Sequence, residues 1–306
     1  MIPYDKPVYK NGRRVLYHGP KQGTARSSAS KSSRAAATSA VAATKAPADK
    51  PVRLTIAIDP HFGAELAKAL KPKGVDLVMT QQGPADLFLM SMPVGAAANA
   101  PASMNEGRLA IARLFDCDIA VIGSGAARTL ADLAGKRVAA PPATTPTGRI
   151  ARRLFSAAGL AVTFVDAAPG AGARALRLRA ADAYVVMSAA LDLSDAPAGA
   201  RILSVPYVGE LREQFLPAEI TKASFPALID AAAVDTVAQP VLLATSDPGG
   251  DRAKRAALAK FTETFFSALG SGDLPDARWR DVNPAAKLPI SRFEAAQAWI
   301  EKPRSN

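Results

Sequence analysis

A hydroxyl-rich turn at residues 144–149 is the part of this chain best suited to hold a small anion. Its residues, Thr-Thr-Pro-Thr-Gly-Arg, lie between an apolar strand predicted at residues 137–140 and an amphipathic helix predicted at residues 147–158. Hydroxyls and free backbone N–H groups at a strand-to-helix turn can bind a carboxylate, and an arginine adds a bidentate donor. The candidate ligand-binding residues of this turn are Thr144, Thr145, Thr147, Gly148 and Arg149.

The same turn also has a purely structural interpretation. Thr145 suits the N-cap of the helix, Pro146 suits its first turn, and Gly159 suits the left-handed residue that ends it. Spacing alone does not separate a capped turn from an anion site, so both interpretations stay open.

A second strand-to-helix turn, at residues 59–63, offers further candidate contacts. His61 would supply a donor and Phe62 a ring face, although a lone histidine is also an ordinary surface or core residue. Polar residues that follow the second and third predicted strands are ordinary turn formers, and they become candidate contacts because they would converge with these two turns. These residues are Gln81, Gln82 and Ser91.

The inventory of nucleophiles and metal ligands predicts no catalytic site. Two histidines and one cysteine do not make a zinc constellation. Cys117 opens an apolar strand, which favours a buried structural thiol over a nucleophile. Ser124 lies between two glycines without the spacing of a nucleophile elbow. We therefore expect no enzymatic activity, no metal and no cofactor.

From about residue 52 onward, predicted strands and helices alternate. We expect strands at 53–59, 75–80, 86–91, 109–115, 118–122, 137–140, 162–165, 183–187, 201–205 and 237–245. We expect helices that start near Pro60, cover 147–158, 173–179 and 252–269, and open with a capping box at Ser291–Glu294. Residues 93–107 are rich in Gly, Pro and small polar residues, so they predict a loop. Alternation of this kind predicts an α/β fold with mostly parallel sheets.

The basic character of the chain is concentrated near its N-terminus. The formal charge is +11, and the first 50 residues, with ten Lys/Arg and two Asp, carry +8 of it. We expect residues 1–51 to be a disordered, basic, Ser/Ala-rich tail and linker. Such a tail can bind anionic surfaces, although nucleic acid is not the favoured partner. No transmembrane helix is expected, and residues 1–20 lack the apolar core of a secretion signal.

The chain resembles the type II periplasmic solute-binding proteins, and more narrowly the TAXI family, the substrate-binding subunits of TRAP transporters. The most specific residues are Thr-Leu-Ala-Asp-Leu-Ala-Gly-Lys-Arg-Val at 129–138, followed by the threonine-rich turn and the helix at 150–160. Weaker landmarks are Ala181–Tyr184, Ser204–Tyr207, Phe225-Pro226, Trp279–Pro284 and Arg292–Trp299. The resemblance covers roughly residues 52–302. Where that family usually has Gly-Ser-Gly-Thr, this chain has a turn containing Pro146, which lacks an N–H donor.

The resemblance implies two α/β lobes joined by crossing strands. The first lobe would comprise residues 52–124 and 241–306, and the second residues 125–240. It further implies that a small organic anion, of the carboxylate or amino-acid class, binds in a cleft between the lobes. The ligand turns would be at residues 60–63, 81–82, 91–92 and 144–148.

Two functions follow as expectations. The first is non-enzymatic capture of a small anion, with lobe closure presenting the loaded receptor to membrane transporter subunits. That role implies a periplasmic location, while the weak signal at the N-terminus leaves a cytoplasmic one open. The second is a binding-protein-like scaffold or assembly protein, without a transported ligand, whose basic tail docks to an anionic partner or membrane.

Overall fold

The computed structural model describes two separate units of the chain. In the first, Met1–Lys50, the described residues form a short antiparallel pair, β1 (Tyr9–Lys10) and β2 (Arg13–Arg14). The second, Pro51–Asn306, is described at residues 51–80, 84–92, 94, 107–125 and 127–302. The rest of the predicted basic tail and most of the predicted loop at 93–107 lie outside the described residues.

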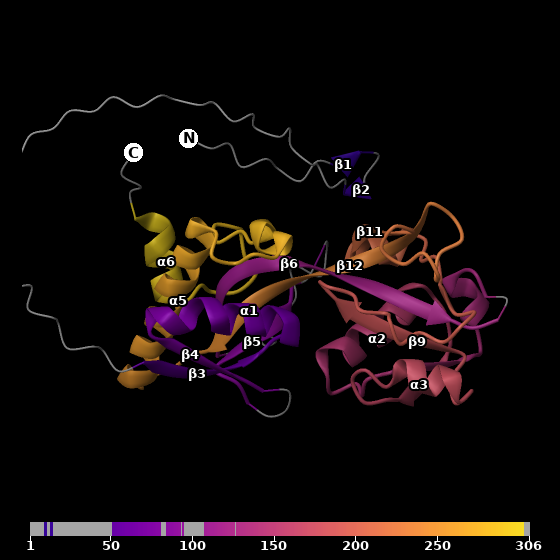
Figure 1. The fold of residues 1–306 in the computed structure, drawn as a ribbon, viewed down its shortest axis with the longest axis horizontal. Coiled ribbons are helices and arrows are strands. Elements are labelled where there is room, and N and C mark those ends of the chain that lie inside the picture. Colours follow the sequence, from indigo (N-terminus) through magenta and orange to yellow (C-terminus); the bar gives the residue numbers. More distant parts are fainter. Residues whose placement is uncertain are drawn as a thin grey trace, which may run out of the picture. The chain divides into compact units, whose positions relative to one another are not determined.

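The second unit has two lobes, which Figure 1 shows side by side. The first lobe holds β3 (Val52–Ala57), α1 (Pro60–Leu70), η1 (Lys71–Lys73), β4 (Val75–Met79), β5 (Leu87–Ser91), α5 (Arg252–Ser271), η5 (Ala277–Asp281) and α6 (Glu294–Glu301). The second lobe holds η4 (Leu130–Leu133), β7 (Arg137–Ala140), α2 (Pro146–Ala157), β8 (Thr163–Asp166), α3 (Gly172–Arg177), β9 (Ala183–Ser188), β10 (Arg201–Ile202), α4 (Glu210–Gln214) and β11 (Leu216–Thr221).

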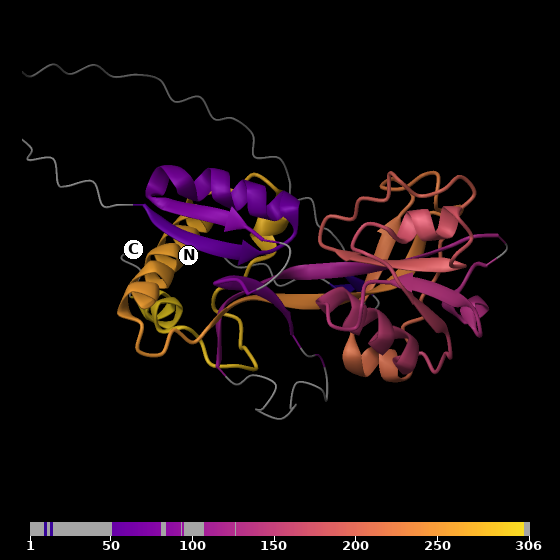
Figure 2. The same ribbon diagram turned by 90° about the horizontal axis from the view of Figure 1, so that it is seen from below.

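Two long strands, β6 (Arg108–Gly123) and β12 (Ala233–Ser246), belong to both lobes. They run next to each other from one lobe to the other (Figures 1 and 2). The main path of the sheet is β4-β3-β5-β12-β6-β9-β7-β8, with β10 beside β6 and β11 beside β12. In the first lobe β3 pairs in parallel with β4 and β5, and in the second lobe β7 pairs in parallel with β8 and β9. Every antiparallel pairing of this sheet includes β6 or β12. The two-lobed α/β architecture is confirmed by this topology.

Each lobe has its own apolar core. In the first lobe, Phe62, Leu66 and Leu70 of α1 face the core together, as their spacing predicts. In the second lobe, α2 and α3 pack against opposite faces of the sheet, because alternate residues of β7 belong to different clusters. The buried apolar residues of β6 from Ile111 to Cys117 belong to the first core, and those from Ile119 onward belong to the cores of the second lobe. The lobe boundaries after residues 124 and 240 remain a proposal.

Several element boundaries differ from the predictions: β12, for example, begins at Ala233 rather than at residue 237. The two strands expected around Asp116 are one continuous strand, since β6 keeps pairing with β12 through that position. The helix expected to stop at Gly270 continues to Ser271, and Gly272, with φ of 75°, ends it. The strand expected at 201–205 is shorter and covers only β10.

The capping box expected at Ser291–Glu294 does not form. Helix α6 starts at Glu294, with Phe293 at the N-cap and no side-chain cap. Ser291 and Phe293 instead exchange backbone hydrogen bonds with Ala110 of β6, at 2.9 and 2.8 Å. This extended pairing prevents the segment from entering the helix. None of the helices in the described part is both long enough and apolar enough to span a bilayer.

Candidate functional site

The carboxyl ends of four strands meet where the two lobes join, and we call this region the seam. Ser91, the last residue of β5, pairs with Val241 of the crossing strand β12. Ser188, the last residue of β9, pairs with Asp118 of the crossing strand β6. Since β3 runs parallel to β5 and β7 runs parallel to β9, their carboxyl ends point toward the seam as well. Open α/β sheets hold ligands beyond such strand ends.

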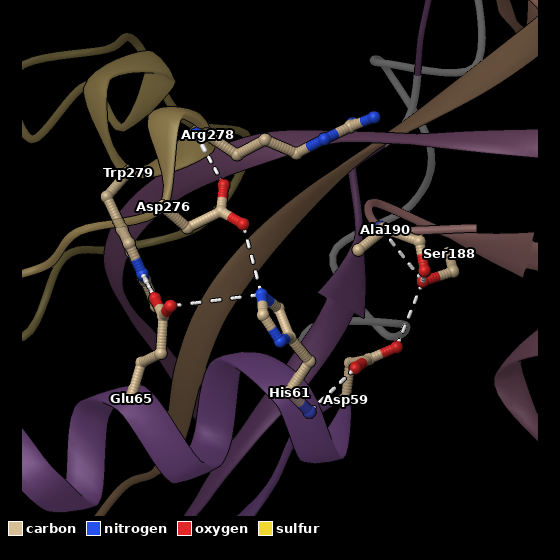
Figure 3. A network of polar contacts seen from close by, with 8 residues as sticks. All are labelled: Asp59, His61, Glu65, Ser188, Ala190, Asp276, Arg278 and Trp279. Atoms are coloured by element: carbon tan, nitrogen blue, oxygen red, sulfur yellow. Dashed lines mark hydrogen bonds and ion pairs between the residues drawn. The ribbon is translucent and has the colours of Figure 1, made fainter. Parts of the chain in front are cut away.

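Asp59 connects the two lobes at the start of α1. Its Oδ1 accepts the His61 N–H at 3.0 Å, so the carboxylate caps the helix as the Asp-Pro pair predicts. Its Oδ2 accepts the hydroxyl of Ser188 at 2.9 Å, and Ser188 Oγ accepts the Ala190 N–H at 3.0 Å (Figure 3). One carboxylate therefore both starts α1 and holds the end of β9.

His61 lies beside two further carboxylates. Its Nε2 is 3.0 Å from Asp276 Oδ2 and 3.9 Å from Glu65 Oε1, and the ring points toward both (Figure 3). The hydrogen bond with Asp276 is the main reason that the pKa of His61 is raised, and the charge of Glu65 adds to it. Among the residues predicted for the site, His61 is therefore the one whose side chain lies beside two carboxylates.

Phe62 points the other way, into the core. Its side chain has an exposed fraction of 0%, and its ring centroid lies 4.5 Å from Phe115 and 5.5 Å from Trp279. The expected role of this ring as a wall for a ligand is therefore wrong. The helical period that put Phe62 in line with Leu66 already indicated a core position.

The threonine-rich turn forms the helix cap that its sequence allowed. Thr145 Oγ1 accepts the Gly148 N–H at 3.0 Å and donates to Pro142 O at 2.8 Å. Arg149 is exposed, and its guanidinium donates to Thr144 O at 2.9 Å. The donors of Thr145 and Gly148 are therefore engaged within the turn, whereas Thr147 is half-buried in the first turn of α2. Gln81 and Gln82 lie outside the described residues.

Arg153, one turn after Arg149 on α2, occupies the seam instead. Its Nη2 donates to Gln239 Oε1, and its guanidinium lies over the Phe215 ring, 5.0 Å from the centroid. Gln239, which has an exposed fraction of 0%, donates in turn to Met92 O at 2.6 Å. The chain of contacts thus runs from α2 through β12 to the segment after β5.

The guanidinium of Arg153 is incompletely satisfied. Its Nε is buried and has no hydrogen-bond partner. No carboxylate of the described residues forms an ion pair with it, and burial lowers its pKa. Arg153 was not among the site residues predicted from the sequence. Its signal was an arginine directly beside the apolar face that Ile150 and Leu154 define.

No protein-family model and no curated protein matches this chain. Similar solved structures include the substrate binding protein of an amino acid ABC transporter, at 14% identity over 72% of this chain and 95% of that chain, with a TM-score of 0.44. An ancestral arginine-binding protein bound to arginine matches at 16% identity over 73% and 95%, with a TM-score of 0.46. The GluR0 ligand-binding core from Nostoc punctiforme in complex with L-glutamate matches at 13% identity over 73% and 95%, with a TM-score of 0.41.

At these identities and TM-scores, the similarity says nothing about what this chain binds. The two-lobed α/β fold rests on the chain's own strand pairing. The narrower resemblance to the TAXI family stays a prediction.

Proposed function

We propose that this protein is a non-enzymatic receptor that binds a small organic anion at the seam between its lobes. The observation that carries the proposal is the guanidinium of Arg153. It is half-buried at the seam, its side-chain acceptor is the neutral amide of Gln239, and its Nε has no acceptor. Buried charges in proteins are ordinarily paired, and a guanidinium pairs best with a planar oxyanion such as a carboxylate.

The surroundings of Arg153 fit an anionic ligand. Helix α2 begins at the seam, and the partial positive charge of a helix N-terminus favours anions. Thr144 and Thr147 lie in that turn and remain candidate hydroxyl donors, as proposed from the sequence. The carboxylate cluster around His61 lies on α1 and η5, so it belongs to a different part of the seam.

Lobe closure is the mechanism that this architecture supports. Only β6 and β12 run through both lobes, among the elements of the described residues, and each lobe has a separate core. A ligand that touches both lobes binds the closed arrangement more tightly and so shifts the population toward it. The finer role, a TRAP-type solute receptor in the periplasm, rests on the resemblance at residues 129–160 and is part of the proposal.

Ligand screening of the full-length protein tests the proposal. We expect a panel of dicarboxylates and amino acids to raise the unfolding temperature for at least one member, because a ligand that binds only the folded state stabilises it. Calorimetry then gives the Kd for that ligand with the wild type, Arg153→Gln and Arg149→Gln. Arg153→Gln should weaken binding at least about tenfold, whereas Arg149→Gln should change it little.

Two results would contradict the proposal. One is a panel in which no anion raises the unfolding temperature of the wild type. The other is a Kd that Arg153→Gln leaves unchanged although the variant is folded.

The concentration of charge in residues 1–50 supports a second candidate function, docking of the tail to an anionic partner or membrane. Deleting these residues separates the two. The receptor keeps its anion affinity without the tail, whereas a scaffold that works through the tail loses its binding to anionic vesicles.

A further inference from the structure

Three side chains of different types present donor atoms to one point beside the seam. His61 Nε2, a Glu65 carboxylate oxygen and an Asp276 carboxylate oxygen all lie within 4.8 Å of one another. His61 and Glu65 are one turn apart on α1, and Asp276 is the N-cap residue of η5. The two elements are more than 200 positions apart in the chain, and Figure 3 shows all three side chains turned toward the same space.

The outer oxygen of each carboxylate is held by a separate donor. Trp279 Nε1–H donates to Glu65 Oε2 at 2.7 Å, and the Arg278 N–H donates to Asp276 Oδ1 at 2.8 Å. Trp279 is itself buried in the first core, so its indole is fixed by packing. These contacts leave Glu65 Oε1 and Asp276 Oδ2 facing the imidazole. Outer hydrogen bonds that orient carboxylate and imidazole ligands are a regular feature of metal sites.

We propose that His61, Glu65 and Asp276 bind a divalent transition-metal ion, with Zn²⁺ as the best fit. One imidazole nitrogen and two carboxylate oxygens are a donor set that Zn²⁺ accepts, and three protein ligands leave a further position for water. Ligand atoms about 2.0–2.1 Å from a tetrahedral Zn²⁺ lie about 3.3 Å apart. Nε2 lies 3.0 Å from Asp276 Oδ2 and 3.9 Å from Glu65 Oε1, and the three donor atoms lie within 4.8 Å of one another, so small side-chain movements bring them to this spacing.

The alternative is an ordinary ion pair in which a proton, not a metal, lies between His61 and its two carboxylates. The side chains of Glu65 and Asp276 are only 19% and 24% exposed, so two negative charges are gathered in a partly desolvated place. A divalent ion balances both carboxylates, whereas a protonated imidazole balances one. Metal binding displaces the proton shared with Asp276 and releases it to solvent.

This site goes beyond the proposed anion receptor. It lies entirely on elements of the first lobe and shares no residue with the Arg153 contacts. The metal site and the anion site can therefore be tested, and can fail, separately.

The first experiment titrates the full-length protein with Co²⁺, whose visible absorption reports the coordination geometry, and then displaces it with Zn²⁺. We expect one equivalent of Co²⁺ to bind with low coordination number. His61→Ala, Glu65→Gln and Asp276→Asn should each weaken binding by about 100-fold or more, since even second-layer changes cost about 10–100-fold. Trp279→Phe should weaken it by about tenfold.

Two variants are matched controls. Asp273→Asn removes a carboxylate three residues before Asp276 that is bonded to Lys73 and Ser271 instead. His18→Ala removes the other histidine of the chain. Both should bind Co²⁺ like the wild type. Circular dichroism and the unfolding temperature establish that each variant is folded.

A further measurement keeps His61, Glu65 and Asp276 unchanged, so it does not depend on whether the variants at these positions fold. The chain has two histidines, so ¹H–¹⁵N spectra of the imidazoles contain two sets of signals. The signals that remain in His18→Ala belong to His61, and we expect Zn²⁺ to shift them. If Co²⁺ fails to bind at one equivalent, if folded His61→Ala binds it as tightly as the wild type, or if Zn²⁺ leaves the His61 signals unmoved, the proposal is overturned.

Discussion

At the scale of single residues, Gly148 shows how closely the first turn of α2 approaches the two prolines that follow β7. A Cβ atom at this position would overlap with the backbone carbonyl oxygens of Pro141 and Pro142. Backbone atoms cannot move aside as a flexible side chain can, so the turn accepts only glycine here.

We therefore predict that Gly148→Ala destabilises the protein by about 1–3 kcal/mol, the usual cost of overpacking. Gly270→Ala is the matched control, because Gly270 is also a helical glycine but has open space around it. That variant should be neutral or stabilising by up to about 1 kcal/mol. Urea denaturation of both variants measures the difference, and an equal effect of the two would refute the steric argument.

Local spacing predicted the helix cap of the threonine-rich turn but not the contacts made by the arginines of α2. Thr145 was predicted as a helix cap from local spacing, and the hydrogen bond to Gly148 confirms that interpretation. Arg149 and Arg153 lie four residues apart on one helix, and only the fold shows which of them reaches Gln239. The carboxylate of Asp276 near His61 was missed for the same reason, because 215 positions separate the two residues.

At the scale of elements, Asp86 ties three elements of the first lobe together. Its Oδ2 accepts the Thr55 N–H at 2.8 Å and the Thr55 hydroxyl at 2.7 Å, which joins the start of β5 to β3. Its Oδ1 lies 3.0 Å from Lys254 Nζ of α5. Burial alone would raise the pKa of Asp86, but the hydrogen bonds from Thr55 and Lys254 outweigh burial, and the pKa is lowered.

A carboxylate with a lowered pKa in the folded state stabilises the protein at pH values above its unfolded pKa, near 4. That contribution is lost as the pH falls through the lower folded pKa. We predict that Asp86→Asn costs about 1–3 kcal/mol at pH 7 and that the difference from wild type shrinks below pH 4. Urea denaturation across this pH range measures it.

Asp76→Asn is the control for this experiment, because Asp76 is 4.0 Å from Arg53 and both side chains are exposed. An exposed pair contributes little, so this variant should differ from wild type by less than about 0.5 kcal/mol throughout. A deficit of Asp86→Asn that stays constant down to pH 2 would show that ionisation of Asp86 is not involved.

Elements that depend on local patterns were predictable, and elements that depend on distant partners were not. The apolar period of α1 and α2 and their N-caps were read directly from the sequence. The continuity of β6 through Asp116 depends on β12, and on Arg113, which holds that carboxylate at 2.6 Å. The start of α6 depends on Ala110, far away in the chain.

At the scale of the whole second unit, the two lobes are joined by two long strands and a few polar contacts at the seam. Asp59 and Ser188 form one of these contacts, and the Arg153–Gln239–Met92 series forms another. Apolar contact adds to them, since Met187 of β9 packs against the cores of both lobes. Gln239 is the central residue, since its buried amide accepts a hydrogen bond from Arg153 of α2 and donates one to the carbonyl of Met92.

A double-mutant cycle on Arg153 and Gln239 tests whether this series couples the lobes. Gln239→Leu removes the amide and leaves the guanidinium and the Met92 carbonyl without it, which should cost about 1–3 kcal/mol. Arg153→Met removes the cation together with its unsatisfied Nε, so it should cost less. In the double variant no buried guanidinium lacks an acceptor, so the loss of folding free energy should be smaller than the sum of the single losses by at least about 0.5 kcal/mol. Additive losses would mean that the two residues act independently and that this series does not couple the lobes.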